Sequence, residues 1–213
     1  MELPRGGCTS VFSKRHRAFP SGAKDRLSEV DEIKVGIALE LATLHTLTGA
    51  DFIQKLKQIA ARSEFNAVKG EVGIFSVGGE SNDDYSNLIN AARKAAEHGY
   101  KVFLLPNPKG LRTADYIFER KGVYKMFDLK TISGKSSVDN RLSESIDQTN
   151  RVLLNMTVEY NPGSLARSIK RYFELNRNAR EVLILKGRKQ LSVTRKTIDD
   201  PNFFRTFIKR YGK

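Results

Sequence analysis

The sequence predicts an α/β protein with a mixed central sheet flanked by helices and an N-terminal helical extension. Three observations predict this class. Apolar residues recur at three- and four-residue steps between residues 32 and 60, which is the period of a helix. From residue 70 onward, short apolar runs alternate with helical patterns, as in α/β folds. Two pairs of these runs lie close enough along the chain to form hairpins.

The N-terminal part divides into an arm and a pair of helices. Residues 1–30 mix Gly, Pro, Ser and basic residues, a composition that predicts a flexible basic arm. A helical period of apolar residues covers 32–47 and resumes over 52–60, with Gly49 between the two stretches. Residues 31–69 are therefore interpreted as a helical extension.

Residues 70–213 are interpreted as the main domain, built around a mixed sheet of about six strands. Apolar runs that predict strands occupy 72–77, 101–105, 114–119, 124–130, 151–155, 182–185 and 191–194. Helical patterns occupy 85–98, 138–150, a stretch after Ser164 and a final stretch after Pro201.

Capping residues predict where several of these helices begin and end. Gly99 follows the helix over 85–98 at the position where a left-handed residue commonly ends a helix. Ser164 is expected to cap the start of the next-to-last helix with its hydroxyl group. Asp200 and Pro201 have the order expected of a cap followed by the first helical residue of the final helix.

The charge of the chain is large and unevenly distributed. Its 213 residues include 37 Lys and Arg against 24 Asp and Glu, a formal net charge of +13. Residues 164–213 alone hold 14 basic and 4 acidic residues, a net charge of +10. A localised basic block of this kind is typical of a protein that binds a polyanion such as nucleic acid.

Other features exclude several classes of protein. No apolar run approaches the ~18 residues that a membrane-spanning helix needs, and the first residues lack the apolar stretch of a signal peptide. Cys8 is the one cysteine of the sequence, which excludes an intramolecular disulfide framework and argues against a Cys/His zinc site. A cytoplasmic location is therefore expected.

Two acids and a lysine form the candidate catalytic group. If 114–119 and 124–130 pair as neighbouring strands, Asp115 and Asp128 can converge, and Lys130 shares the face of Asp128 because side chains two apart on a strand point the same way. Two carboxylates can hold a magnesium or manganese ion. A lysine beside them can stabilise the charge on a phosphoryl group. The alternative interpretation of this group is a salt bridge at the end of a strand.

The order of these residues resembles the PD-(D/E)xK nuclease superfamily, in which a helix precedes three strands that carry the acids and the lysine, and a second helix follows. Within it, the chain is most similar to the C-terminal tRNase domains of contact-dependent growth inhibition (CdiA-type) toxins. The similarity covers roughly residues 70–195. The residues that carry it are Ala91-Ala92, Gly99-Tyr100-Lys101-Val102, Leu105-Pro106, Ala114-Asp115-Tyr116, Asp128-Leu129-Lys130-Thr131, Ser145, Gln148 and Arg151-Val152-Leu153-Leu154.

The resemblance implies a restriction-endonuclease-like fold and a metal-dependent endonuclease that cleaves RNA, with tRNA as the expected substrate. It implies that Asp115 and Asp128 bind Mg²⁺ or Mn²⁺, that Lys130 is the catalytic lysine and that Gln148 faces the scissile phosphate. It also implies an acidic immunity protein as partner. One departure is the first helix, where Asn87 or Asn90 occupies the position of the glutamate that many such nucleases carry.

Further polar and basic residues are candidates for contact with nucleic acid, because they follow the acid–lysine group or belong to the basic C-terminal block. These are Thr131, Lys135, Ser136, Ser137, Arg141, Arg151, Lys170, Arg171, Arg188 and Lys189.

Two alternatives to an RNA nuclease stay open at this point. One is a DNA endonuclease of the restriction or repair type. The other is a non-catalytic nucleic-acid-binding module of a phage or mobile element, in which the acids and the lysine are separated or closed in a salt bridge. The sequence leaves the oligomeric state undetermined.

Overall fold

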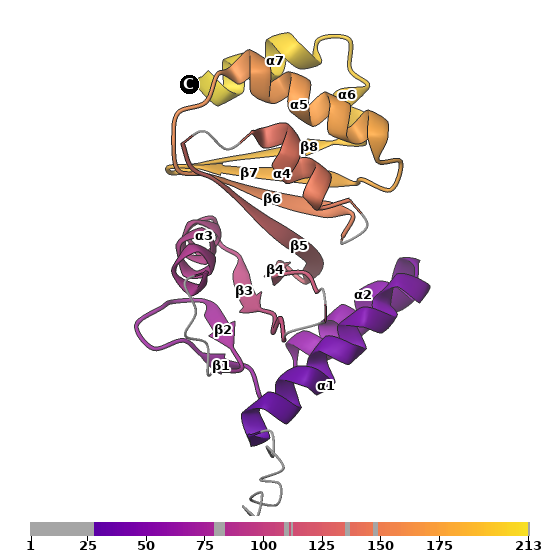
Figure 1. Ribbon diagram of the computed structural model, residues 1–213, viewed down its shortest axis with the longest axis vertical. Helices are drawn as coiled ribbons and strands as arrows, with labels where there is room; N and C mark the ends of the chain where they lie inside the picture. Colours follow the sequence, from indigo (N-terminus) through magenta and orange to yellow (C-terminus); the bar gives the residue numbers. More distant parts are fainter. Residues whose placement is uncertain are drawn as a thin grey trace, which may run out of the picture.

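The computed structural model describes residues 28–78, 84–108, 111, 113–134, 137–146 and 149–212. Eight strands form one sheet in the order β1-β2-β3-β4-β5-β6-β7-β8. Helices cover both faces of this sheet, and a pair of helices precedes the first strand (Figure 1). The predicted α/β class, with a mixed sheet and N-terminal helices, is confirmed.

The helices are α1 (Glu29–Thr43), the short 3-10 helix η1 (Leu44–Thr46), α2 (Gly49–Ala60), α3 (Tyr85–Glu97), α4 (Val138–Glu144), α5 (Pro162–Leu175), α6 (Arg195–Ile198) and α7 (Phe203–Gly212). The strands are β1 (Asn66–Ala67), β2 (Ile74–Ser76), β3 (Lys101–Leu104), β4 (Tyr116–Arg120), β5 (Val123–Ile132), β6 (Arg151–Met156), β7 (Glu181–Lys186) and β8 (Lys189–Thr194). In the described part of the chain, no helix is both long enough and apolar enough to cross a bilayer.

The long strand β5 joins two halves of the sheet. Its first segment, Val123–Phe127, pairs antiparallel with β4, whereas its second segment, Asp128–Ile132, pairs parallel with β6. The change of partner therefore falls between Phe127 and Asp128. The hairpin before it turns at Lys121 and Gly122, which have φ of 53° and 77°. Two successive positive φ values match the twist of a tight hairpin.

One face of the sheet is covered by α3. Alternate residues of β4 and β5, such as Tyr116, Phe118 and Phe127, pack with the inner side of α3 in one apolar cluster. Leu153 of β6 and Leu183 of β7 belong to the same cluster, so this face continues across both halves.

Two separate groups of helices cover the opposite face. Ile117 and Met126 point there and pack with α1 and α2 over the β3–β5 half. Val152 and Leu154 also point there and pack with α4, α5 and α7 over the β5–β8 half. Both α2 and α4 contact β5, and Figure 1 shows them on either side of this strand. The partner change in β5 thus lies between the two helix groups.

Four details of the prediction need correction. The final helix, α7, begins at Phe203, so Pro201 lies in the turn before it and is not its first residue. The sheet has eight strands rather than about six. The seven apolar runs correspond to β2 to β8, and β1 is only two residues long and carries no periodic signal. Helix α4 ends at Glu144, not at residue 150. Helix α5 begins at Pro162 and is capped by Asn161, whose Oδ1 accepts the Ser164 N–H at 2.9 Å. Because proline suits the first helical position, the helix begins at Pro162, before the predicted cap Ser164.

Candidate active site

Asp115 is fixed at the end of the β4 ladder by three hydrogen bonds. Its backbone N–H donates to the Phe127 carbonyl at 3.0 Å, and its carbonyl accepts from the Leu105 N–H at 2.9 Å. Its side-chain Oδ2 accepts from the Leu129 N–H at 2.6 Å. The carboxyl group therefore accepts a backbone N–H of β5 just beyond the last residue of β5 that pairs with β4. It lies at the point where β5 changes its partner from β4 to β6.

Asp128 and Lys130 lie on one face of β5, as the alternation of a strand requires. They pair in register with Val152 and Leu154 of β6, whose side chains belong to the cluster beneath α5. Asp128 Oδ2 and Lys130 Nζ are 2.9 Å apart, and the two side chains are 5% and 13% exposed. This places a buried ion pair beside the partner change.

The two carboxyl groups are electrostatic neighbours. Burial raises the pKa of Asp115 to about 7, and the negative charge of Asp128 contributes to this rise, while the hydrogen bond from Leu129 and the charge of Lys130 oppose it. Burial also raises the pKa of Asp128, which the charge of Lys130 partly offsets. Two acids that repel each other in a buried place hold a proton more tightly or require a cation.

The residues present suit one small, hard cation. Asp128 Oδ2 is buried, and no well-directed hydrogen bond reaches it from the described residues, although the Lys130 amine is at ion-pair distance. A magnesium ion in a protein commonly takes one or two carboxylates and completes its shell with water and substrate oxygens. Within the described ranges no group of three or more Asp, Glu, His or Cys side chains could hold a metal ion. Asp115 and Asp128 are therefore the donors available here.

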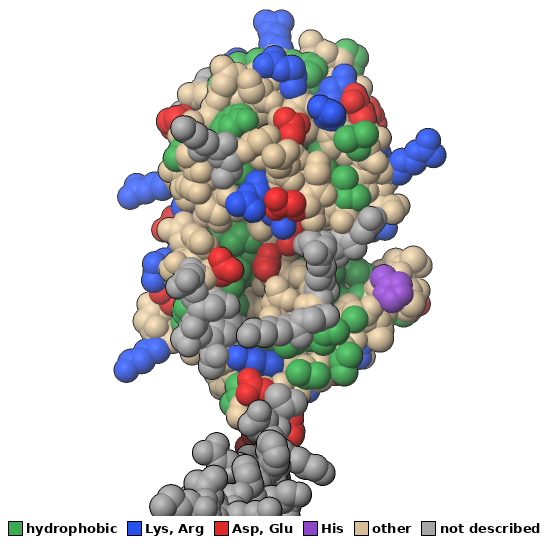
Figure 2. All heavy atoms as spheres, viewed as in Figure 1, with side chains coloured by type: hydrophobic (Ala, Val, Ile, Leu, Met, Phe, Trp, Pro, Cys, Tyr) green, Lys and Arg blue, Asp and Glu red, His purple; other side chains and the backbone are tan. Residues whose placement is uncertain are grey.

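Figure 2 shows acidic side chains gathered at the waist of the molecule, between its two halves, with basic side chains close by. Glu144, at the end of α4, is one further acid on this side, because its charge also acts to raise the pKa of Asp128. Glu144 is 49% exposed and pairs with Arg141 at 3.1 Å. Sequence reasoning did not select Glu144, since α4 was expected to continue past it.

Three of the remaining predicted residues lie outside the described residues: Gln148, Lys135 and Ser136. Ser137 precedes α4 at the capping position, and its side chain makes no capping hydrogen bond. Thr131 pairs in register with Asn155 on the α3 face, opposite Asp128, and its buried Oγ1 lacks a hydrogen-bond partner in the described part of the chain.

Among the predicted basic residues that the structure describes, Arg141 of α4 pairs with Glu144, whose charge acts on Asp128, and the others have different surroundings. Arg151 lies at the start of β6, where its side chain approaches Glu181 at 3.4 Å and donates to Asn150 at 3.0 Å. Burial lowers the pKa of Arg151. The others lie on the helix above β6 and β7 or at the β7–β8 turn: Lys170, Arg171, Arg188 and Lys189.

A polar group on the α3 face was missed by sequence reasoning. Lys94 Nζ donates to Asn155 Oδ1 at 2.6 Å, and Asn155 donates in turn to Asn90 Oδ1 at 3.2 Å. Asn155 is fully buried, and burial lowers the pKa of Lys94. The available signal was a lysine within the apolar stripe of α3, next to Ala95.

No protein-family model matches the chain, and no curated protein matches it. Among solved structures, the chain is similar to a CdiA-CT/CdiI toxin and immunity complex from Burkholderia pseudomallei. The two are 17% identical, the TM-score is 0.37, and the match covers 55% of this chain and 92% of that one.

Proposed function

We propose that this protein is a metal-dependent nuclease that hydrolyses phosphodiester bonds in RNA, with tRNA as the expected substrate. One observation carries the proposal. Asp115 and Asp128 act on each other electrostatically at the point where β5 changes partner, and the Lys130 amine lies 2.9 Å from Asp128 Oδ2. Because α2 and α4 cover β5 on either side of this point, a substrate strand could approach from the face between them.

The order of elements supports a relation to the PD-(D/E)xK pattern. Helix α3 is followed by β3, β4 and β5 and then by α4, which is the helix, three strands and helix of that pattern. The first acid immediately precedes the second of these strands, and the second acid and the lysine lie on the third. Residue type, spacing and position in the fold thus agree with one another.

Asp115 and Asp128 would hold the ion, with the Leu129 N–H fixing the orientation of the Asp115 carboxylate. When bound, a divalent ion neutralises charge on the phosphoryl oxygens and lowers the pKa of water. The Lys130 amine, 2.9 Å from Asp128 Oδ2, can turn toward a phosphate beside that carboxylate. There it would donate a charge-assisted hydrogen bond to the oxygen on which negative charge develops.

One feature favours the non-catalytic alternative. The Lys130–Asp128 ion pair is the closed arrangement expected if the group only stabilises the strand. The presence of Asp115 weighs against this, because a second, partly buried carboxyl group that repels Asp128 is unfavourable for a purely structural pair. The choice of RNA over DNA, and an acidic immunity protein as partner, rest on the resemblance together with the net charge of +13.

The test compares cleavage of tRNA, total RNA and plasmid DNA by the purified chain in Mg²⁺, Mn²⁺ or EDTA. We expect Asp128→Asn and Lys130→Met each to reduce cleavage by at least about 100-fold, the usual effect of losing a group that stabilises the transition state. Asp51→Asn, on the exposed side of α2, is the matched control and should cleave at the wild-type rate. Wild-type cleavage in EDTA, or full activity in both site variants, would contradict the proposal.

A further inference from the structure

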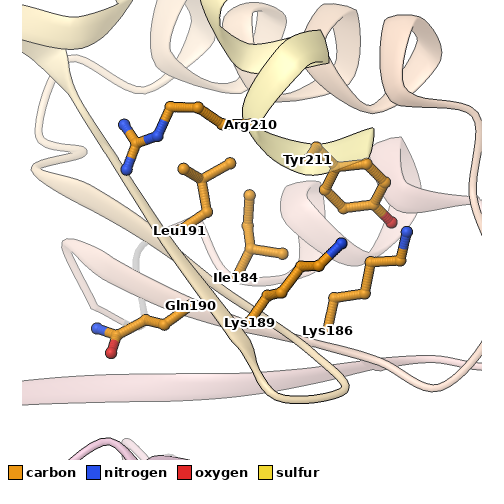
Figure 3. A pocket seen from close by; sticks show the side chains of 7 residues that line it. All are labelled: Ile184, Lys186, Lys189, Gln190, Leu191, Arg210 and Tyr211. Atoms are coloured by element: carbon orange, nitrogen blue, oxygen red, sulfur yellow. The ribbon is translucent and has the colours of Figure 1, made fainter. Parts of the chain in front are cut away.

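A second candidate site lies at the far edge of the sheet, between β8 and the C-terminal helix α7. It is a pocket of about 340 Å³. Ile184 and Leu191, which pair across β7 and β8, supply apolar side chains, and three cations, one amide and one tyrosine complete the lining: Lys186, Lys189, Arg210, Gln190 and Tyr211 (Figure 3). Pockets that bind small molecules commonly combine an apolar surface with a few polar groups in this way.

The cations of this pocket are largely free to meet an anion. The side chains of Lys189 and Arg210 make no ion pair or hydrogen bond with any residue that the structure describes. Lys186 approaches Glu159 at 2.7 Å, but the Glu159 side chain is 84% exposed and can move into solvent. Three positive charges thus face one exposed negative charge, so the pocket favours an anionic ligand.

Tyr211 adds a polar atom that lacks a partner. Tyr211 is 2% exposed, and its hydroxyl group has no hydrogen-bond partner in the described ranges. Figure 3 shows the hydroxyl directed toward the amine end of Lys186, whose Nζ lies 4.3 Å from the centre of the tyrosine ring. A buried hydroxyl without a partner is costly, and an acceptor oxygen from a ligand would satisfy it.

We propose that this pocket binds one nucleotide, with the phosphate held by Lys186 and Lys189 and the base against Ile184 and Leu191, on the side where Figure 3 shows Arg210. Phosphate oxygens suit Lys donors, whereas the apolar side chains suit the flat, uncharged surface of a base. The nucleotide belongs either to a nucleic acid strand or to a free nucleoside phosphate. Only the first of these sources rests on the proposed nuclease function.

This pocket is separate from the candidate active site. Lys130 pairs with Leu154, Leu154 with Ile184, and Ile184 with Leu191. Three strand spacings of ~4.8 Å therefore put the pocket about 14 Å from the acid–lysine group. A nucleotide bound here is not the one whose phosphate is cleaved.

The test measures binding of AMP, adenosine and inorganic phosphate by isothermal titration in EDTA, with the full chain carrying Asp128→Asn. Catalysis is absent under these conditions, so failure of the nuclease proposal leaves the result interpretable. We expect AMP to bind saturably and more tightly than either adenosine or inorganic phosphate. The double variant Lys189→Ala/Arg210→Ala should weaken AMP binding by about tenfold or more, as the loss of a charge-assisted hydrogen bond from Lys189 and of the positive charge of Arg210 predicts.

The matched control is Lys196→Ala/Arg205→Ala, which removes the same charge from exposed positions outside the pocket and should change AMP binding by less than about twofold. Tyr211→Phe should weaken AMP binding without lowering the melting temperature, because its hydroxyl has no protein partner to lose. Competition between AMP and a single-stranded RNA would identify the strand as the source; AMP binding without competition would identify a free nucleotide. Equal losses in the two double variants, or no saturable AMP binding, would overturn the proposal.

Discussion

Asp115 connects strand geometry with chemistry at the scale of a single residue. Its backbone belongs to the antiparallel ladder with β5, while its carboxyl group accepts the N–H of Leu129. One carboxyl oxygen therefore fixes the strand and the rest of the group remains beside Asp128. The physical consequence is a partly buried acid whose pKa is raised to about 7, and this can be measured without any assumption about substrate.

We predict that the metal-free protein becomes less stable as the pH rises. The pKa of Asp115 is about 7 in the folded chain against 3.8 for the ordinary value, so between these values the folded state binds more protons than the unfolded state. The free energy of unfolding should therefore fall by at most about 1.4 kcal/mol per pH unit from this group.

Urea unfolding in EDTA between pH 4.5 and 7.5 checks this. Asp115→Asn should flatten the profile, whereas Asp51→Asn should leave it unchanged. A stability that rises over this interval in the wild type and not in Asp115→Asn would contradict the assignment.

Glu181 is the second residue whose role is decided by contacts rather than by sequence. It is 5% exposed, lies 2.8 Å from Lys125 and 3.4 Å from Arg151, and accepts a hydrogen bond from Ser192 at 2.7 Å. The predicted phosphate contact at Arg151 is thus engaged inside the protein.

We expect Glu181→Gln to destabilise the fold by about 3 kcal/mol, because it leaves the half-buried Arg151 without a counter-charge. Glu97→Gln, an exposed residue on α3, is the control and should have little effect. Chemical denaturation at pH 7 measures both. An equally small effect of the two substitutions would show that Arg151 does not depend on Glu181.

At the scale of elements, α5 shows how a cap is decided by the residue before a proline. Asn161 accepts the N–H of Ser164, and Pro162 opens the helix. Asn161→Ala should reduce the free energy of unfolding by about 1 kcal/mol, the usual value of an N-cap. Ser164→Ala should change it by less than about 0.5 kcal/mol. Urea unfolding measures both variants. A larger decrease in the free energy of unfolding for Ser164→Ala than for Asn161→Ala would show that Ser164 is the cap, as the sequence predicted.

Strand β5 is the element on which the candidate site depends. Its ten residues exceed the common strand length of 5–6, and the excess allows one strand to serve two partners. Asp128 is the first residue after the change and Lys130 follows two positions later, so both side chains emerge on the face between the two helix groups.

At the scale of the whole molecule, the N-terminal helices are part of the core. Ile37, Leu56 and Ile59 are fully buried and share a cluster with Phe103 of β3 and Ile117 of β4. Their removal would expose one side of the strand that follows Asp115. The helical extension and the sheet should therefore unfold together.

Ile59→Ala tests this cooperativity. The substitution should cost about 2–5 kcal/mol, as for other buried large-to-small changes, and should shift the far-ultraviolet circular dichroism and tyrosine fluorescence transitions equally. Leu39→Ala, at a position 52% exposed, should cost less than about 0.5 kcal/mol. Separate transitions in Ile59→Ala would show that residues 31–69 unfold independently.

Much of the fold could be predicted because its signals are local. The apolar period of α3, the hairpin turn at Lys121 and Gly122, and the shared face of Asp128 and Lys130 all depend on residues within four positions of one another. The shortest elements, β1 and α6, were not predicted, since two to four residues carry no measurable period.

The sequence by itself determined the α/β class, the uneven charge and an acid–lysine pair on one side of a strand. Only the tertiary structure decided that β5 changes partner at Asp128, that the Asp115 carboxyl group binds the neighbouring strand, and that Arg151 is paired internally. The reason is physical: local periodicity is a property of a few consecutive residues, whereas strand partners and ion pairs depend on which distant segments bury their apolar faces together.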